Sequence, residues 1–251
     1  MYNYIGDVMR KMILAILDGV GLREETHGNA FKQANKPNFD YLWNTYNHSE
    51  LEASSTYVGL LEGQMGNSEV GHLNIGAGRI VYQPSQLINE MIHNGEFFKN
   101  NQLLEVINHV NTNQSKLHVI GLLSDSGVHS LMGHFMAVLK MAKDNNVNNL
   151  YFHVITDGRD TPPKCTYEFV SKLEEAIKEN NIGTIATLSG RYYSMDRDNN
   201  WDRIKRGYDA IVNGIGDKFN NSKELIDYNY NKDITDEFIE PGIISETGTI
   251  E

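Results

Sequence analysis

The sequence predicts an α/β protein in which parallel sheets are flanked by helices. From residue 116 onward, short apolar segments alternate three times with longer helical patterns. This alternation is typical of right-handed βαβ units, whose helices cover both faces of a parallel sheet. Nearer the N-terminus, one apolar run and one glycine-rich stretch stand apart from the regular pattern. We therefore expect two regions, with a boundary near residues 80–84.

The first region contains one predicted strand and one predicted helix before the glycine-rich stretch. Residues 12–17 form a continuous apolar run that ends at Asp18-Gly19, which is typical of a buried strand followed by a turn. Pro37 marks the start of a helix that continues through Trp43. Because so few strands cannot close a sheet, we expect something outside this sequence to complete it.

The second region is more regular. We predict helices over residues 85–94, 102–110, 131–142, 162–178 and 201–212, and strands over residues 117–123, 150–155 and 184–188. Thr161 as N-cap and Pro162 in the first turn mark the start of the fourth of these helices. The tail beyond Gly214 is polar and ambiguous.

Composition narrows the class of protein. The 251 residues are 40% hydrophobic and 22% charged, which fits a soluble globular chain. No apolar run approaches the roughly 18 residues that span a membrane, and the first residues lack a secretory signal. Cys165 is the only cysteine, which excludes an intrachain disulfide. These features predict a cytoplasmic protein with no membrane partner. The net charge of −11 opposes binding to nucleic acid.

The glycine-rich stretch, residues 63–79, surrounds Ser68 at a position where a helix could begin. Free N–H groups and the helix dipole favour a phosphate there, so Ser68 is a candidate nucleophile. The alternative is that Ser68 is only an N-cap. Asp18 either caps its turn or supplies an oxygen ligand to Mg²⁺ or Mn²⁺, and two such metals could activate the serine hydroxyl. The stretch matches neither a Walker A loop nor a dinucleotide fingerprint.

Polar clusters follow the three predicted strands of the second region. They comprise residues 124–129, 157–160 and 189–197. Because ligands bind beyond the carboxyl ends of parallel strands, we expect the three clusters to share one rim. Arginines there grip carboxylate or phosphate through paired hydrogen bonds. Each residue alone could be an ordinary polar loop residue, but their recurrence favours a pocket for a small polyanion.

Five sequence strings together resemble the cofactor-independent (2,3-bisphosphoglycerate-independent) phosphoglycerate mutases of the alkaline phosphatase superfamily. The strings are Ile16-Leu17-Asp18-Gly19 and residues 63–79, 122–130, 157–160 and 189–197. The resemblance runs from about Lys11 to the C-terminus. It implies an isomerase that interconverts 3-phosphoglycerate and 2-phosphoglycerate in glycolysis through a phosphoserine intermediate. It also implies two Mn²⁺ ions per complete enzyme, or Mg²⁺ in some members.

The resemblance also implies individual roles. Ser68 matches the phosphorylated serine, and Asp18 and Ser68 match ligands of one metal. The positions that match substrate-binding residues are His129, Arg159, Asp160, Arg191 and Arg197. Asp160 also matches the residue that moves the proton of the glycerate hydroxyl.

By the same resemblance, residues 1–82 belong to a phosphatase-like, metal-binding domain and residues 83–251 to an incomplete transferase domain. Family chains are longer and carry a further arginine pair, a catalytic lysine and most of the metal ligands. Residues 1–11 resemble an N-terminal extension. We therefore expect the N-terminal half of a mutase, as a fragment, a split gene product or a misread frame. The alternatives are a non-catalytic module that needs a complementing C-terminal half, and a phosphohydrolase of the same superfamily.

Overall fold

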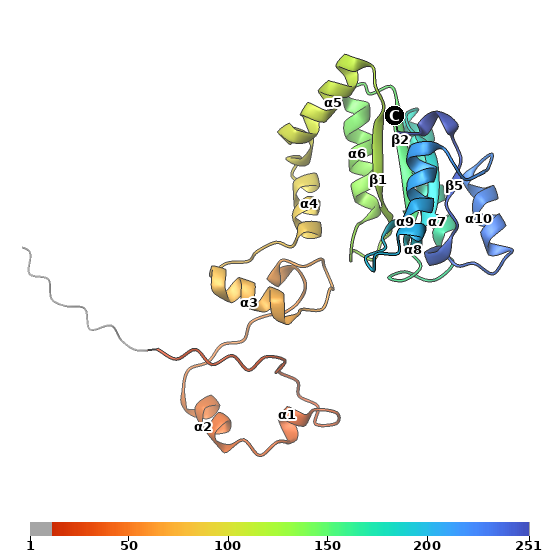
Figure 1. The fold of residues 1–251 in the computed structure, drawn as a ribbon. Coiled ribbons are helices and arrows are strands. Elements are labelled where there is room, and N and C mark those ends of the chain that lie inside the picture. The colour runs from red at the N-terminus through yellow and green to blue at the C-terminus, as the bar shows by residue number, and fades with distance from the viewer. Residues whose placement is uncertain (1–11, 251) are drawn as a thin grey trace, which may run out of the picture. The chain divides into compact units, whose positions relative to one another are not determined.

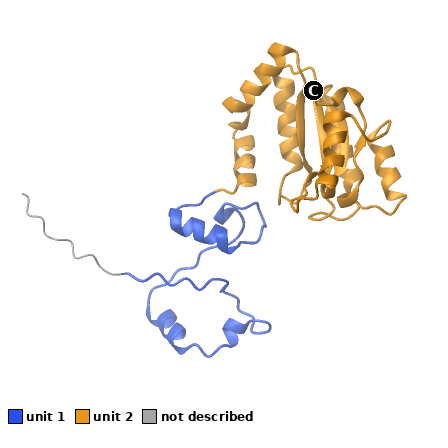
Figure 2. Ribbon diagram, viewed as in Figure 1, with its two compact units in different colours: residues 1–81 blue, residues 82–251 orange. Residues whose placement is uncertain are grey.

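The computed structural model describes residues 12–250, so the predicted N-terminal extension lies outside the described residues. The chain divides into two compact units, residues 1–81 and residues 82–251 (Figure 2). The assignment of these parts to a phosphatase-like and a transferase domain stays a prediction. None of the helices between residues 12 and 250 is long and apolar enough to cross a membrane.

Unit 1 contains helices and turns but no strand within residues 12–81. Its elements are α1 (Ala30–Gln33), α2 (Pro37–Thr45), the 3-10 turn η1 (Ser55–Val58) and α3 (Ser68–Ala77) (Figure 1). The helix expected from Pro37 is confirmed as α2. Val58, Leu60 and Val70 form a small buried cluster.

The buried strand predicted over residues 12–17 is wrong. The segment has no regular structure, and Ile13 is 92% exposed. A strand is stable only when a neighbour pairs with its backbone and a face is covered. Residues 18–81 supply no strand to pair with it. Only the turn at Asp18-Gly19 forms as expected, with Gly19 at a positive φ of 78°.

Unit 2 is built around a five-stranded sheet in the order β1-β2-β3-β5-β4. The strands are β1 (Leu117–Leu123), β2 (Leu150–Thr156), β3 (Thr184–Gly190), β4 (Asp217–Lys218) and β5 (Gly242–Ile243). The first three are parallel, with Leu117 opposite Leu150, and they confirm the three predicted strands. β5 pairs antiparallel to β3, and β4 pairs parallel to β5. Both short strands come from the tail, where the sequence pattern was ambiguous.

Helices flank this sheet, as Figure 1 shows. They are α4 (Pro84–His93), α5 (Asn101–Asn113), α6 (Met132–Asp144), α7 (Thr166–Asn180), α8 (Arg191–Ser194), α9 (Trp201–Tyr208) and α10 (Ser222–Tyr230). Short 3-10 turns are η2 (Phe97–Lys99), η4 (Asp236–Phe238) and η5 (Glu246–Gly248), and the π-helical segment η3 (Asp209–Asn213) directly follows α9. Phe152 and Leu188 on the strands and Leu139 and Leu173 on the helices are almost fully buried in one core. Burial on both faces explains why the central strands read as continuous apolar runs.

The start of α7 differs from the prediction. The helix begins at Thr166 rather than at Pro162, and Thr161 does not cap it. Instead, one carboxylate oxygen of Asp236 accepts hydrogen bonds from the N–H groups of Cys165 (2.7 Å) and Thr166 (2.9 Å). A carboxylate at this end also complements the helix dipole. Because the capping residue lies far along the chain, local sequence signals could not locate it.

A line of hydrogen-bonded side chains crosses the three main strands. His118 Nδ1 on β1 lies 2.9 Å from His153 Nε2 on β2, and His153 Nδ1 lies 2.9 Å from Thr187 Oγ1 on β3. His153 is only 1% exposed. Its burial, together with the neighbouring His118, lowers the pKa of His153 to about 4.

This buried histidine makes the stability of unit 2 sensitive to acid. Because the folded-state pKa of about 4 lies below the unfolded value of about 6.5, the stabilisation is complete above pH 6.5. It is lost as the pH falls from about 6.5 to about 4, by up to about 3 kcal/mol. We expect His153→Gln to unfold more easily at pH 7 but to lose less of its unfolding free energy on acidification.

Denaturant unfolding at several pH values measures this difference. His109, an exposed histidine on α5, provides a matched control. His109→Gln should follow the wild-type pH dependence. Parallel curves for wild type and His153→Gln would contradict the prediction.

Candidate functional site

Ser68 is the first residue of α3 and lies against Asp18. Its Oγ donates a 2.5 Å hydrogen bond to Asp18 Oδ2, across fifty positions of sequence. The N-cap of α3 is Asn67, whose side chain accepts a hydrogen bond from the N–H of Val70 (2.9 Å). The alternative that Ser68 serves as the N-cap is therefore wrong. Since Asn67 caps the helix, the Ser68 hydroxyl is available for other chemistry.

The glycine-rich loop before α3 is held by a close backbone approach. A Cβ at Gly66 would lie 1.8 Å from the carbonyl oxygen of Ala53, so only glycine fits there. The N–H of Ser55 donates to the carbonyl oxygen of Gln64 (2.8 Å), on the same loop. These contacts place the start of α3. His72, one turn into the helix, has its Nδ1 3.3 Å from Ser68 Oγ and 2.8 Å from Ser68 O.

Asp18 and Ser68 supply two hard oxygen donors, the type that Mg²⁺ and Mn²⁺ prefer. Within residues 12–250, however, no group of three or more His, Cys, Asp or Glu side chains could hold a metal ion. One carboxylate and one hydroxyl do not fill the six-coordinate shell that Mg²⁺ requires. The pair therefore fits a portion of a metal site and not a whole one.

In unit 2, Asp157 lies at the centre of a second cluster at the carboxyl ends of the strands. It is 2% exposed and follows β2 directly. Its carboxylate accepts hydrogen bonds from Ser124 Oγ (2.7 Å), from Arg191 Nη1 (2.7 Å) and from the backbone N–H groups of Arg159 and Asp160. Burial favours a raised pKa for Asp157, but these donors outweigh burial and lower the pKa. Asp157 is therefore a charged anchor for the rim.

Arg191 joins the ends of β2 and β3. Its guanidinium is 6% exposed, and Nη1 contacts Asp157 Oδ1 (2.7 Å) and Asp160 Oδ2 (2.6 Å). Burial favours a lowered pKa for Arg191, but the two carboxylates raise it, so the side chain stays charged. His129 Nε2 lies 3.7 Å from the same Asp160 oxygen. His129, Asp160 and Arg191 thus form one continuous cluster.

A cavity of about 90 Å³ opens beside this cluster. It is lined by His129, Arg159, Arg191, Tyr192, Met195, Asp196, Arg197, Asp198 and Arg203. Four of the five predicted substrate-binding residues therefore line it, and Asp160 contacts two of them. The arrangement provides several fixed cationic donors for one small anion. Asp18 and Ser68 belong to unit 1 and form the hydrogen-bonded pair described above.

Sequence reasoning missed Arg203 as a cavity residue. It lies on α9, where the helical pattern indicated a covering helix. Its guanidinium carbon lies 3.7 Å from the Tyr192 ring centroid, and Nη1 donates to Asp196 (2.8 Å). The Asp196 side chain is fully buried. The only local signal for Arg203 is its spacing, six positions after Arg197. Arg197 lies on a loop, whereas Arg203 lies on α9.

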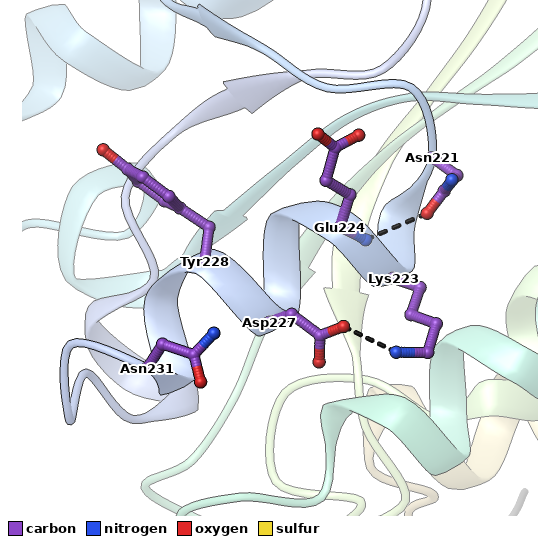
Figure 3. A pocket seen from close by; sticks show the side chains of 6 residues that line it. All are labelled: Asn221, Lys223, Glu224, Asp227, Tyr228 and Asn231. Atoms are coloured by element: carbon purple, nitrogen blue, oxygen red, sulfur yellow. Dashed lines mark hydrogen bonds and ion pairs between the residues drawn. The ribbon is translucent and has the colours of Figure 1, made fainter.

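A larger hollow of about 510 Å³ lies on the outer side of α10. Figure 3 shows the side chains that line it: Asn221, Lys223, Glu224, Asp227, Tyr228 and Asn231. All come from this helix and its two ends. Lys223 pairs with Asp227 (2.5 Å), and Asn221 caps the helix through the N–H of Glu224. Asp227 also accepts a hydrogen bond from the Tyr167 hydroxyl on α7. Because its polar groups hold α10 together and against α7, this hollow is a weaker candidate than the cavity at the strand ends.

The chain is similar in sequence to a family of known proteins. Residues 88–251 match the family model described as BPG-independent PGAM N-terminus (iPGM_N). The 2,3-bisphosphoglycerate-independent phosphoglycerate mutase of Listeria monocytogenes is 52% identical over 235 residues, which cover 94% of this chain and 46% of the relative. The protein of the same name from Clostridium tetani is 48% identical over 239 residues, covering 95% and 47%. The chain spans about half the length of these relatives.

A solved structure shows the same fold. Leishmania mexicana phosphoglycerate mutase, crystallised at low cobalt concentration, superposes with a TM-score of 0.72 and is 33% identical. The match covers 87% of this chain and 42% of that one.

The two-donor geometry at Ser68 predicts weak metal binding by this chain. In a calorimetric titration of the 251-residue protein with Mn²⁺, we expect a dissociation constant on the order of 10⁻⁴ M or weaker, because affinity depends on the number of charged ligands. Asp18→Asn should weaken it further, whereas Asp40→Asn on α2 should leave it unchanged. Two tight sites in the wild type would contradict this prediction.

Proposed function

The chain belongs to the family of BPG-independent phosphoglycerate mutases, and on that basis we propose that it supplies the phosphorylated serine and the substrate-holding surface of an enzyme that interconverts 3-phosphoglycerate and 2-phosphoglycerate in glycolysis. The observation that carries the proposal is the 2.5 Å hydrogen bond between Ser68 and Asp18 at the start of α3. A helix N-terminus and an adjacent carboxylate suit a hydroxyl that must lose a proton and receive a phosphoryl group.

Ser68 is the nucleophile in this proposal. Its Oγ forms a bond to the phosphorus of 3-phosphoglycerate as the bond between phosphorus and the glycerate oxygen breaks. Asp18 orients the Ser68 oxygen and takes up its proton as the new bond forms, and the departing glycerate oxygen gains a proton. The N–H groups of the first turn of α3 stabilise negative charge on the transferred group. A bound Mn²⁺ or Mg²⁺ would supply activation of the hydroxyl and neutralise phosphate charge.

The arginine cavity of unit 2 holds the glycerate in this proposal. Arg159, Arg191 and Arg197 bind its carboxylate, because planar guanidinium groups match carboxylate geometry. Asp160, paired with His129, moves the proton of the glycerate hydroxyl. Retention of glycerate decides the reaction. Glycerate that stays bound turns and takes the phosphate back on its other hydroxyl. If glycerate dissociates first, the net reaction is that of a phosphatase. The density of arginines therefore argues against a phosphohydrolase.

A second candidate is a binding module that needs another chain for turnover. Two observations favour it: no group of three metal-binding side chains occurs among residues 12–250, and the apolar residues 12–17 are exposed. A complementing C-terminal half would supply the missing ligands and could cover the apolar segment. In this candidate, unit 2 still binds phosphoglycerate.

Phosphorylation of Ser68 tests the leading proposal. We expect an added phosphate on Ser68 when an enzyme that includes this sequence in full-length form is mixed with 3-phosphoglycerate and Mn²⁺. Intact-mass and peptide mass spectrometry measure it. Ser68→Ala should abolish the added mass and the isomerisation, whereas Ser171→Ala, an exposed serine on α7, should leave both intact. Turnover without phosphate on Ser68 would refute the nucleophile assignment.

A steady-state assay tests whether this chain needs a second chain for turnover. We expect the purified 251-residue chain to show no mutase turnover, because its described residues do not complete a metal site. Addition of a separate C-terminal half from a relative should restore turnover. Measurable activity of the chain alone would exclude the module. Free phosphate released at the rate of turnover would instead indicate a phosphohydrolase.

A further inference from the structure

The turn η4 (Asp236–Phe238) inserts between two loops of the candidate site. A Cβ at Gly158 would lie 2.5 Å from the backbone N of Glu237, and a Cβ at Gly190 would lie 2.3 Å from its carbonyl oxygen. Both positions therefore require glycine. Gly158 follows β2, and Gly190 ends β3. The backbone of Glu237 is thus packed between the two strand ends that form the cavity rim.

The neighbouring residue Asp236 fixes this turn from several directions. Its carboxylate caps α7, as described above, and it also accepts a hydrogen bond from the Tyr230 hydroxyl. Its N–H donates to the carbonyl oxygen of Pro163 (2.9 Å), and its own carbonyl oxygen accepts from Thr156 Oγ1 (2.6 Å). Glu237 is therefore presented from a rigid backbone.

The Glu237 side chain contacts Arg159 along one edge of the guanidinium. Oε1 accepts hydrogen bonds from Nε (3.0 Å) and from Nη2 of Arg159. The Glu237 side chain is 14% exposed, whereas the Arg159 side chain is 54% exposed. An arginine has two edges that can bind an anion, and these bonds occupy the Nε–Nη2 edge. Glu237 leaves the Nη1 end of Arg159 unoccupied, and Arg159 is one of the residues that line the cavity.

We propose that Glu237 is a positioning residue for ligand binding: it holds Arg159 by its inner edge so that the outer end meets the carboxylate or phosphate of a phosphoglycerate. The inference rests on the proposed function of unit 2. A free arginine loses much rotamer entropy when it binds a ligand, and a preorganised one loses less. No sequence motif indicated Glu237, because it lies in the ambiguous tail.

The opposite role would be competition, in which Glu237 occupies the place of the ligand. The geometry favours positioning, because Glu237 bonds the side edge of Arg159 rather than the Nη1–Nη2 end. Its backbone also lies outside the cavity lining. The two roles predict opposite effects on affinity when the carboxylate is removed.

The test compares Glu237→Gln, Glu237→Asp and a matched control in the 251-residue chain. Glu240 serves as the control, because it lies in the same tail and pairs with Arg206 (3.0 Å) and Lys232 (3.3 Å), away from the cavity. Thermal unfolding verifies that each variant is folded. Glu237→Asp keeps the charge but shortens the side chain, so it separates charge from placement.

The first readout needs no ligand. In ¹⁵N NMR spectra, the Nε–H signal of Arg159, assigned with Arg159→Lys, reports whether this edge is hydrogen-bonded. We expect a slowly exchanging signal in the wild type and in Glu240→Gln. The signal should be lost or averaged in both Glu237 variants. An unchanged signal in Glu237→Gln would overturn the inference.

The second readout is the calorimetric affinity for 3-phosphoglycerate at constant ionic strength. We expect both Glu237 variants to bind roughly tenfold more weakly, the scale of one charged hydrogen bond, and Glu240→Gln to bind like the wild type. Arg159→Ala combined with Glu237→Gln should be no weaker than Arg159→Ala alone.

The outcomes are distinguishable. Unchanged or tighter binding by Glu237→Gln overturns the positioning role, and tighter binding would indicate competition. Wild-type affinity in Glu237→Asp would show that charge alone matters, which also overturns it. If the wild-type chain binds no 3-phosphoglycerate, the proposed function of unit 2 fails, while the Arg159 signal still decides whether Glu237 orders this side chain.

Discussion

The candidate site of unit 2 depends on one buried cation, the Arg191 guanidinium at the end of β3. It is held between Asp157 and Asp160, both in the loop after β2. A buried charge is tolerated only when it is paired, and removal of one partner from such a pair typically costs about 3–5 kcal/mol. Because Arg191 follows β3 and its two partners follow the neighbouring strand β2, this ion-pair cluster keeps the two loops together. The cavity beside it therefore has a fixed wall.

The anion binding proposed for this cavity would not come from net charge, since the chain carries −11. Carboxylates pair with most of the arginines there: Glu237 with Arg159, Asp157 and Asp160 with Arg191, and Asp196 with Arg203. Arg197 makes no ion pair with residues 12–250. The carboxylates orient the guanidinium groups and still leave N–H donors for an anion, because each arginine has more donors than its partner occupies. Recognition would then rest on directed hydrogen bonds more than on a broad positive potential.

The parts of the fold that sequence reasoning predicted correctly are those determined by local patterns. The strands ending at Leu123, Thr156 and Gly190 were found from their apolar runs, of which the last two are largely buried, and the polar clusters that follow them do share a rim. The parts that were missed depend on distant contacts. Asp236 caps α7 from about seventy positions away, and Glu237 reaches Arg159 from a tail whose sequence pattern is ambiguous. The apolar run at residues 12–17 failed for the related reason that apolar character alone does not supply a pairing partner.

The two clusters differ in completeness, and this difference separates two chemical tasks. The unit 2 cluster is satisfied by residues of unit 2, since each buried charge there has a partner within hydrogen-bond distance. In unit 1, the Ser68–Asp18 pair is hydrogen-bonded but provides only two oxygen donors, fewer than a divalent ion takes. In the proposed function, holding a small sugar-acid anion requires the first set alone, whereas phosphoryl transfer requires the second set plus further ligands. Under the proposed function, binding and transfer therefore depend on different residues, and affinity without turnover would reflect this division rather than misfolding.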